Sequence, residues 1–282
     1  MLHELCTALN QAGYRAGILY IIEGSQQSQG FKFAYSNEKS LQDPDGTYFD
    51  FTSDKSEAEI GSYIRNSCII YPDIVKGNPA GGKSYATYVL GRPQFKIESN
   101  FIISYSKLYI DHADLILYKP FISEWMHSLE TQHWSKRKLD LTYIGKGQEY
   151  MECLHIPGSV LVERDWPRDK RQLAALLRNC RYFFSWDTVS ATNTDAVLCG
   201  AIPVLMHDLQ IPRSVLDTGE HGPFPPVSYF PGMELAEISG NRDAIDKAIL
   251  GMQKSLSDHL FKWPQRVKDL ATAIADPSRL LN

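Results

Sequence analysis

The sequence predicts an α/β protein built on parallel sheets, and three observations lead to this fold class. Short apolar runs typical of buried strands alternate with amphipathic helical stripes through the second half of the chain. Glycine and proline residues end these segments at short intervals. The chain has 282 residues, 43% of them hydrophobic and 22% charged, which suffices for the cores of two modest domains.

The first half of the chain predicts a helix, one strand and a long surface loop before further strands. Apolar residues recur at positions 2, 5, 6 and 9, the spacing of an amphipathic helix, and Gly13 follows as its C-terminal cap. The apolar run 17–22 predicts a strand covered on both faces, and the polar stretch from 23 to about 57 predicts a surface loop. Because domains of this class normally open on a strand, we expect the first domain to lack its first strand or the sequence to begin late.

Further strands and one helix complete the expected first domain, residues 1–135. The predicted strands are 68–71, 101–103 and 115–118, and a short helix is predicted over 84–90. Lys119-Pro120 and the polar run 135–138 are typical of a junction between domains.

The expected second domain, residues 136–262, alternates more regularly. Strands are predicted at 141–144, 160–162, 182–184 and 203–206, with helices starting near 169 and covering 192–199. Two helices, about 241–256 and 264–275, are expected at the end of the chain. Residues 263–282 are expected to cross back to the first domain.

Composition and charge exclude several classes of function. The net charge of −4 gives no basic surface, so no nucleic-acid partner is expected. The five cysteines never stand at CxxC spacing and the eight histidines include no HExxH pair, so neither a disulfide scaffold nor a metal site is predicted. No stretch approaches the ~20 apolar residues of a membrane span, and no signal sequence is visible. We therefore expect a cytoplasmic protein without a cofactor, with peripheral contact at the inner face of the membrane left open.

Three loops carry residues suited to binding a phosphorylated ligand. The first is Gly145-Lys146-Gly147, directly after the predicted strand 141–144. Its glycines allow the backbone to approach a phosphate, and Lys146 offers a positive charge. The alternative is a tight turn with a solvated lysine.

The second loop follows the predicted strand 182–184 and holds the largest set of polar side chains. Helix N–H groups and hydroxyls suit a diphosphate, whereas carboxylates suit sugar hydroxyls. The predicted ligands of this loop are Asp187, Ser190, Thr192, Asn193, Thr194 and Asp195. The alternative is structural, because Thr192-x-x-Asp195 is a capping-box spacing in which Asp195 only caps its own helix.

The third loop, Gly77–Ser84, matches the phosphate-loop pattern GxxxxGK[ST]. An apolar strand precedes it and a helix is predicted after it, which would favour a nucleoside triphosphatase or kinase that uses Lys83 and magnesium. Against this function, Pro79 stiffens the loop, and no clear strand ending in a magnesium-binding Asp accompanies it.

Residues 186–204 resemble the donor-binding domain of GT-B glycosyltransferases, whose retaining members carry a Glu-x7-Glu motif. Here seven residues separate Asp187 from Asp195, and the run from Ala196 to Val204 matches the turn that follows in the family. The resemblance implies two Rossmann-like domains, with Asp195 binding the ribose of a nucleotide sugar and Asp187 facing the sugar. Both are Asp where the family has Glu, so each carboxylate has a shorter reach.

The chain also resembles a narrower group of bacterial envelope-polysaccharide transferases. The similar stretches are Tyr143-Ile-Gly-Lys-Gly147, Arg164-Asp-Trp-Pro167 and Tyr71-Pro-Asp-Ile-Val-Lys-Gly-Asn-Pro79. The last is similar to the acceptor-domain loop of that group, which gives the phosphate-loop match a second explanation. On the acceptor side we therefore name Asp73 and Asn78, and also His112, which stands beside acidic residues just before a predicted strand.

Together, the residues and the resemblance imply a metal-independent, retaining glycosyltransferase of the hexosyltransferase type. Its donor would be a nucleotide sugar and its acceptor a glycan or lipid-linked sugar of a cell-envelope polysaccharide such as lipopolysaccharide. Asp187 and Lys146 are predicted to be catalytic, Lys146 by stabilising the leaving phosphate. Gly145, Gly147 and residues 190–195 are predicted to bind the donor. Two alternatives stay open: the phosphate-loop enzyme, and a protein that binds the donor without turning it over.

Overall fold

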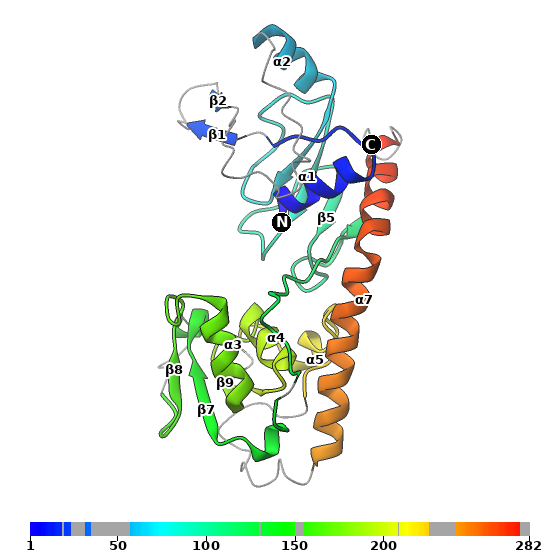
Figure 1. The fold of residues 1–282 in the computed structure, drawn as a ribbon. Coiled ribbons are helices and arrows are strands. Elements are labelled where there is room, and N and C mark those ends of the chain that lie inside the picture. The colour runs from blue at the N-terminus through cyan, green and yellow to red at the C-terminus, as the bar shows by residue number, and fades with distance from the viewer. Residues whose placement is uncertain are drawn as a thin grey trace. The chain divides into compact units, whose positions relative to one another are not determined.

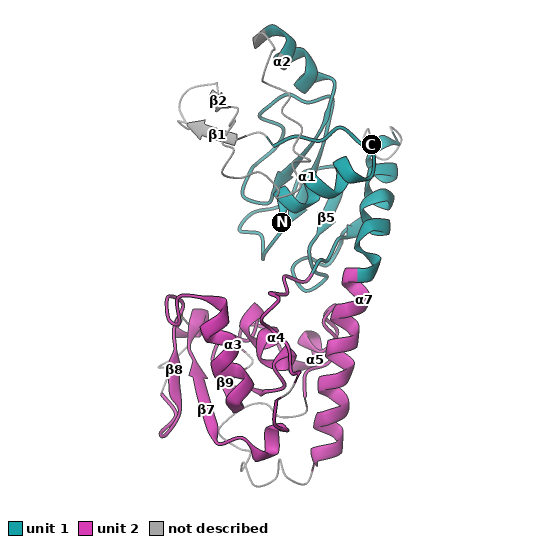
Figure 2. Cartoon of the chain, in the orientation of Figure 1, with its two compact units in different colours: residues 1–119, 261–282 teal, residues 120–260 magenta. Residues whose placement is uncertain are grey.

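The computed structural model describes residues 1–18, 20–23, 32–34, 57–129, 131–149, 155–207, 209–225 and 241–276. The chain divides into two compact units, which Figure 2 colours separately. Unit 1 comprises residues 1–119 and 261–282, and unit 2 comprises residues 120–260. The first boundary therefore falls at Lys119-Pro120, earlier in the chain than residue 135.

Unit 1 holds a four-stranded parallel sheet whose strands are adjacent in chain order. The strands are β3 (Cys68–Pro72), β4 (Ser84–Val89), β5 (Ile102–Ser104) and β6 (Leu115–Ile116). The three connections, 73–83, 90–101 and 105–114, lie wholly within the described residues and contain no helix. This departs from the usual parallel sheet, in which helices form the crossovers.

Helices from the two ends of the chain cover one face of this sheet (Figure 1). They are α1 (Leu2–Gln11) and the C-terminal part of α7 (Arg242–Ala275). The core between them contains Leu5, Leu9, Ala86, Tyr88, Phe101, Ile103, Leu117, Trp263, Val267 and Leu270. Because side chains alternate along a strand, Thr87, between Ala86 and Tyr88, lies on the other face of β4.

The prediction of a helix over 84–90 is wrong, because these residues form β4. The segment Ser-Tyr-Ala-Thr-Tyr-Val is rich in aromatic and β-branched residues, which suit a strand. Its backbone pairs with β3 on one side and β5 on the other. A helix at this position would leave β3 without a strand partner and would separate it from β5 and β6.

The start of the chain is confirmed in part. Helix α1 ends as predicted, with Gly13 at a φ of 90° and its N–H bonded to the carbonyl of Asn10. The predicted strand 17–22 is shifted to β1 (Tyr20–Glu23), which pairs antiparallel with β2 (Lys32–Ala34) in a separate sheet. The predicted loop 23–57 thus contains β2 and reaches the start of α2 (Glu57–Arg65), while its other residues lie outside the described ones.

Unit 2 confirms the predicted alternation of strands and helices. Its parallel sheet has the order β10-β9-β7-β8. The strands are β7 (Leu139–Tyr143), β8 (Val160–Val162), β9 (Cys180–Ser185) and β10 (Ile202–Leu205), with α3 (Lys170–Asn179), α4 (Ala191–Leu198) and the short α5 (Arg213–Leu216). The crossovers through α3 and α4 run in the same direction across the sheet, so right-handed connections put both helices on one face, where they contact each other.

The two helices predicted at the end of the chain form one helix, α7, with Pro264 inside it. A proline removes one backbone donor and favours a break, which is why the sequence pattern suggested two segments. Trp263 and Val267 are buried in the core of unit 1, and this packing holds the helix together across the proline. Residues 242–260 of α7 belong to unit 2 and 261–275 to unit 1.

Arg137 is buried, with 6% of its surface exposed, and binds segments of unit 2 that are distant in sequence. Its guanidinium donates to the carbonyls of Gln132, Leu177, Cys180 and Cys199 and to the Thr131 hydroxyl. These acceptors include the ends of α3 and α4. Arg137 therefore fastens both helices to the segment before β7.

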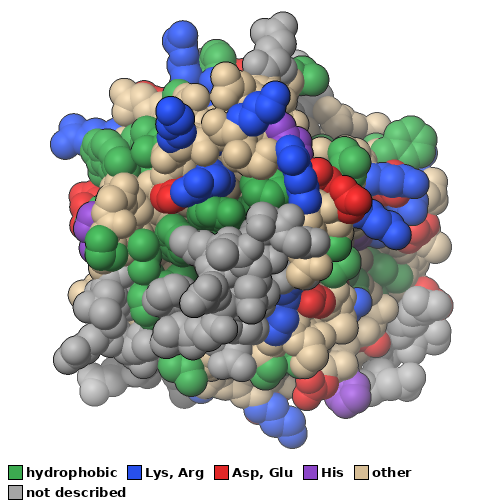
Figure 3. All heavy atoms as spheres, turned by 90° about the horizontal axis from the view of Figure 1, so that it is seen from below, with side chains coloured by type: hydrophobic (Ala, Val, Ile, Leu, Met, Phe, Trp, Pro, Cys, Tyr) green, Lys and Arg blue, Asp and Glu red, His purple; other side chains and the backbone are tan. Residues whose placement is uncertain are grey.

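The surface gives little indication of a specialised environment. Figure 3 shows basic, acidic and apolar side chains interspersed on the face that it displays. Within the described residues, no helix combines the length and apolar character needed to span a bilayer. The four cysteines in the described part of the chain, Cys6, Cys68, Cys180 and Cys199, are free thiols.

Candidate functional site

The carboxyl edge of the unit 2 sheet is the natural place for a ligand. Strand β7 has β8 on one side and β9 on the other, so the chain leaves β7 in one direction and later returns in the opposite one. In parallel α/β sheets, ligands bind at this reversal, beyond the carboxyl ends of the two central strands. The loops after β7 and β9 are two of the three loops singled out in the sequence.

The loop after β7 forms the 3-10 turn η3 (Gly145–Glu149) and packs against the end of β9. The N–H of Lys146 donates to Asp187 Oδ2 over 3.0 Å. A Cβ at Gly145 would lie 2.6 Å from the same oxygen, and a Cβ at Gly147 would overlap the carbonyl oxygen of Trp186. Contact with the protein's own backbone and carboxylate thus already requires both glycines, so their presence does not by itself indicate a phosphate.

Lys146 follows β7 and carries the one positive charge of its loop's Gly-Lys-Gly stretch. The residue is exposed, and its ammonium group forms no ion pair with any described residue. It therefore provides a positive charge beside the carboxyl edge of β7.

Asp187 is 3% exposed and is the second residue after the end of β9. Its Oδ2 accepts from Lys146, whereas its buried Oδ1 has no hydrogen-bond partner among the described residues. Its carbonyl accepts from Asn193 Nδ2 and Ser185 Oγ. The backbone at Asp187 is therefore fixed, while one carboxylate oxygen keeps its capacity to accept.

Asn193 and Thr188 repeat this pattern. Asn193 donates through Nδ2 to the carbonyls of Asp187 and Thr188, and its Oδ1 is buried without a partner among the described residues. The Thr188 N–H donates to Gln210 Oε1 over 2.7 Å, and the Thr188 hydroxyl is likewise buried and unpaired within the described chain. Buried polar atoms normally have partners, so three unpaired oxygens within seven residues of chain mark this segment as one where partners are missing.

The alternative that Asp195 forms a capping box with Thr192 at the start of α4 is wrong. The N-cap is Ser190, whose hydroxyl accepts from the N–H of Thr192. Thr192 lies in the first turn and Thr194 farther along, both partly buried. Because the helix starts before Thr192, Asp195 is too far along α4 to cap it.

Asp195 instead pairs with Lys170, the first residue of α3. Lys170 Nζ lies 2.7 Å from Asp195 Oδ2. Burial raises the pKa of Asp195, and the hydrogen bond and positive charge of Lys170 partly offset this shift. Sequence reasoning missed Lys170, since nothing in the sequence joins two residues that stand 25 positions apart on different helices.

Two further polar residues that the sequence did not single out support the loop after β9. Gln210 holds the Thr188 N–H, as described above. His207 is buried, and its Nε2 lies 2.6 Å from the Trp186 carbonyl, while the Leu209 N–H donates to its Nδ1. The ring is therefore neutral with the proton on Nε2, and it holds Trp186 in place next to Asp187.

The predicted acceptor-side residues of unit 1 are Asp73, Asn78 and His112, and no hydrogen bond among the described residues joins the three. Asp73 accepts from the N–H of Leu90, and Asn78 bonds Tyr71 and Gly82 within its own loop. His112 is exposed, and no hydrogen bond or ion pair among the described residues joins it to either. Asn78 therefore shapes its loop rather than facing a ligand.

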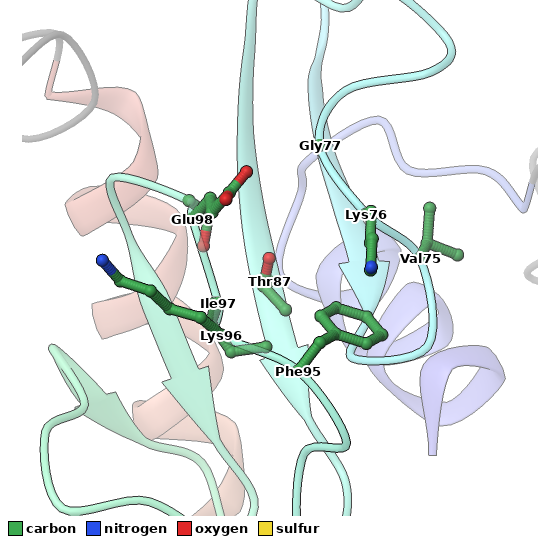
Figure 4. A pocket seen from close by; sticks show the side chains of 9 residues that line it. Val75, Lys76, Gly77, Thr87, Phe95, Lys96, Ile97 and Glu98 are labelled. Carbon is green, nitrogen blue, oxygen red and sulfur yellow. The ribbon is translucent and has the colours of Figure 1, made fainter.

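A cavity of about 240 Å³ lies beside this loop. It is lined by Val75, Lys76, Gly77, Thr87, Phe95, Lys96, Ile97, Glu98 and Ser99. In Figure 4, Lys76 and Phe95 lie on one side of Thr87 and Glu98 on the other, while Lys96 extends away. The Lys76 ammonium lies 4.8 Å from the centre of the Phe95 ring.

The phosphate-loop pattern lacks the helix that it requires. Residues 77–83 lead into strand β4, whereas a phosphate loop leads into a helix whose N–H groups bind the phosphates. The Asn78 side chain, through its bonds to Gly82 and Tyr71, occupies the interior of this loop. The geometry of unit 1 therefore gives this alternative no support.

Among the described residues, no group of three or more His, Cys, Asp or Glu is placed to hold a metal ion. Comparison of the chain with models of protein families, with curated proteins and with solved structures found no match in any of the three.

Proposed function

We propose that this chain is a glycosyltransferase of the two-domain GT-B type, which binds a nucleotide-sugar donor at the carboxyl edge of the unit 2 sheet. The observation that carries the proposal is that three buried oxygens within residues 187–193 have no partner among the described residues: Asp187 Oδ1, Thr188 Oγ1 and Asn193 Oδ1. A sugar presents many hydroxyl donors, and each can satisfy an acceptor of this kind. These three residues follow β9 at the sheet edge where parallel α/β proteins bind ligands.

The proposed roles follow from charge. Oxygen acceptors repel phosphate, so the diphosphate is assigned to the exposed Lys146 and to the N-terminus of α4. Asp187 accepts from the transferred sugar through Oδ1, and Asp195 accepts from the ribose. In the reaction, the bond between the sugar's anomeric carbon and the diphosphate breaks, the acceptor hydroxyl bonds to that carbon, and its proton passes to the departing diphosphate. Lys146 stabilises the negative charge of the departing nucleoside diphosphate without a metal ion.

The acceptor, a glycan or lipid-linked sugar, is assigned to unit 1. The cavity beside Phe95 supports this assignment, because it combines an aromatic ring with Lys76, Glu98 and the Thr87 hydroxyl.

A ligand screen tests the proposal. The purified chain is melted with nucleoside diphosphates and nucleotide sugars, with and without EDTA. A ligand present at 100 times its dissociation constant should add about 2.7 kcal/mol to the free energy of unfolding. We expect stabilisation by one nucleotide family, unchanged by EDTA. Stabilisation only by a nucleoside triphosphate with magnesium would contradict the proposal.

A turnover assay separates an enzyme from a protein that only binds the donor. We expect slow hydrolysis of the donor by the wild type and none by Asp187→Asn, with the nucleoside diphosphate still bound by both. Binding without turnover in the wild type, with every acceptor sugar tried, would favour the non-catalytic alternative.

A further inference from the structure

The ion pair between Lys170 and Asp195 is asymmetric. The side chain of Asp195 is 5% exposed and that of Lys170 is 56% exposed. Lys170 thus reaches from the surface, at the start of α3, into the interior to contact a carboxylate on the neighbouring helix α4.

The pair uses only one oxygen of the carboxylate. Asp195 Oδ2 lies 2.7 Å from Lys170 Nζ, whereas Oδ1 accepts no hydrogen bond from a described residue. Since a carboxylate oxygen can accept two hydrogen bonds, Oδ1 keeps its full capacity. Its orientation is set by the bond that Lys170 makes to Oδ2.

A lysine in the first turn of a helix is unfavourable for that helix, because it faces the positive end of the helix dipole. The Asp169 N-cap, which accepts from the Gln172 N–H, already satisfies this end of α3. Stability of α3 therefore does not explain Lys170, and its contact with Asp195 does.

We propose that Lys170 is a positioning residue of the donor site, which keeps Asp195 ionised and holds its Oδ2 so that Oδ1 accepts hydroxyls of a bound nucleoside diphosphate. This inference rests on the proposed function, because it assumes that Asp195 meets a nucleoside. Lys170 itself need not touch the ligand.

The surroundings of Asp195 make its charge depend on Lys170. Burial raises the pKa of Asp195, and Lys170 is the group that opposes this. On the same helix, burial and then the charge of Asp195 raise the pKa of the Cys199 thiol to about 12, so Cys199 stays neutral. Arg137 and Arg178 act on Cys199 in the opposite direction. Without Lys170 the Asp195 carboxyl would bind a proton at a higher pH and lose the charge that favours hydroxyl donors.

The experiment compares Lys170→Met with Lys170→Arg and with the matched control Arg171→Met. Arg171 is the next residue of α3, also exposed, and its guanidinium lies over Trp125 rather than near Asp195. Each protein is labelled with ¹³C at the Asp carboxyl carbons, and Asp195 is assigned by its absence from Asp195→Asn. Its carboxyl is titrated by NMR, and the affinities for UDP, GDP, ADP and dTDP are measured by calorimetry over the same pH range.

We expect the Asp195 pKa to be higher in Lys170→Met than in the wild type, and unchanged in Lys170→Arg and Arg171→Met. Affinity for the bound nucleotide should fall with decreasing pH in every protein, but at a higher pH in Lys170→Met. At the acidic end this variant should bind about tenfold more weakly than the wild type, the size of effect expected for a hydrogen bond to a charged group. Equal titration and equal affinity in Lys170→Met and Arg171→Met would overturn the inference.

The two claims fail in different ways. If the wild type binds none of the four nucleotides, the proposed function fails, and with it the role of Asp195 toward a ligand. If the wild type binds one of them and Lys170→Met binds it with the same pH profile, the proposed function stands and only the role of Lys170 is wrong.

Discussion

Units 1 and 2 each hold four parallel strands but connect them differently. In unit 2 the strands are linked through α3 and α4, whose N-termini lie at the carboxyl edge of the sheet. In unit 1 the three connections of the sheet are loops, and the covering helices come from the two ends of the chain. The crossover helices bring polar side chains of distant segments to one edge, and this is where the unpaired oxygens of unit 2 lie. Both sheets are thus parallel, but only the connections of unit 2 bring crossover helices to the carboxyl edge of the sheet.

The first prediction concerns how unit 2 holds its crossover helices. Arg137→Met removes the guanidinium that donates to the carbonyls of Leu177, Cys180 and Cys199. These oxygens then lose that hydrogen-bond donor. We expect the free energy of unfolding to fall by about 3 kcal/mol or more. Urea denaturation followed by tryptophan fluorescence measures this.

Arg181→Met serves as the control for Arg137→Met. Arg181 forms a half-exposed ion pair with Asp140, and its loss should cost about 1 kcal/mol or less. Equal losses for the two variants would show that Arg137 does not fasten unit 2.

The second prediction compares one glycine from each unit. In Gly147→Ala, the new Cβ overlaps the Trp186 carbonyl, where the loops after β7 and β9 meet. In Gly77→Ala, the Cβ meets open space and only the φ of 66° is strained. We expect losses in the free energy of unfolding of about 2–3 kcal/mol for the first variant and about 1 kcal/mol for the second. If Gly77→Ala proves the more harmful, the loop after β3 is the more tightly packed of the two.

The third prediction concerns Asp195, whose pKa is raised by burial. The folded protein then binds this proton more tightly than the unfolded chain, so stability declines as pH rises from the unfolded pKa through the folded one. At neutral pH, the free energy of unfolding of Asp195→Asn should therefore be equal to that of the wild type or higher. Its affinity for a nucleoside diphosphate should fall about tenfold.

Asp169→Asn is the control for Asp195→Asn. Asn caps a helix as well as Asp does, so neither stability nor affinity should change by much. Melting curves and calorimetric titration provide both quantities. A clear loss of stability in Asp195→Asn, with binding intact, would make the carboxylate structural.

The sequence predicted the fold of unit 2 well because its periodicity switches between strand and helix at every element. The strands β7 to β10 and the helices α3 and α4 all follow such switches. In unit 1 the expectation of a helix between strands led to the wrong assignment of 84–90. The central place of β4 between β3 and β5 decides its conformation, and this pairing is not visible within the segment itself.

The candidate site could be predicted only where it is local in sequence. Asp187, in the loop after β9, and Asn193, in the first turn of α4, stand six residues apart, so their proximity follows from the chain. The contact between Lys170 and Asp195 arises because two crossovers of the same hand place α3 and α4 side by side. Predicting this contact would require the strand order of the sheet. Arg137 stands in the polar run 135–138, which suggested a domain junction because charged runs usually face solvent, whereas its side chain is buried against carbonyls of two distant segments.

The central claim is that unit 2, and not the phosphate-loop pattern of unit 1, binds the nucleotide. Calorimetric titration of Lys146→Ala and Lys83→Ala with the nucleoside diphosphate that stabilises the wild type tests it most directly. Both lysines are exposed and lie in glycine-flanked loops, so the two variants are matched. We predict that Lys146→Ala binds about tenfold more weakly than the wild type, while Lys83→Ala binds as tightly. Weakened binding in Lys83→Ala with unchanged binding in Lys146→Ala would contradict the account.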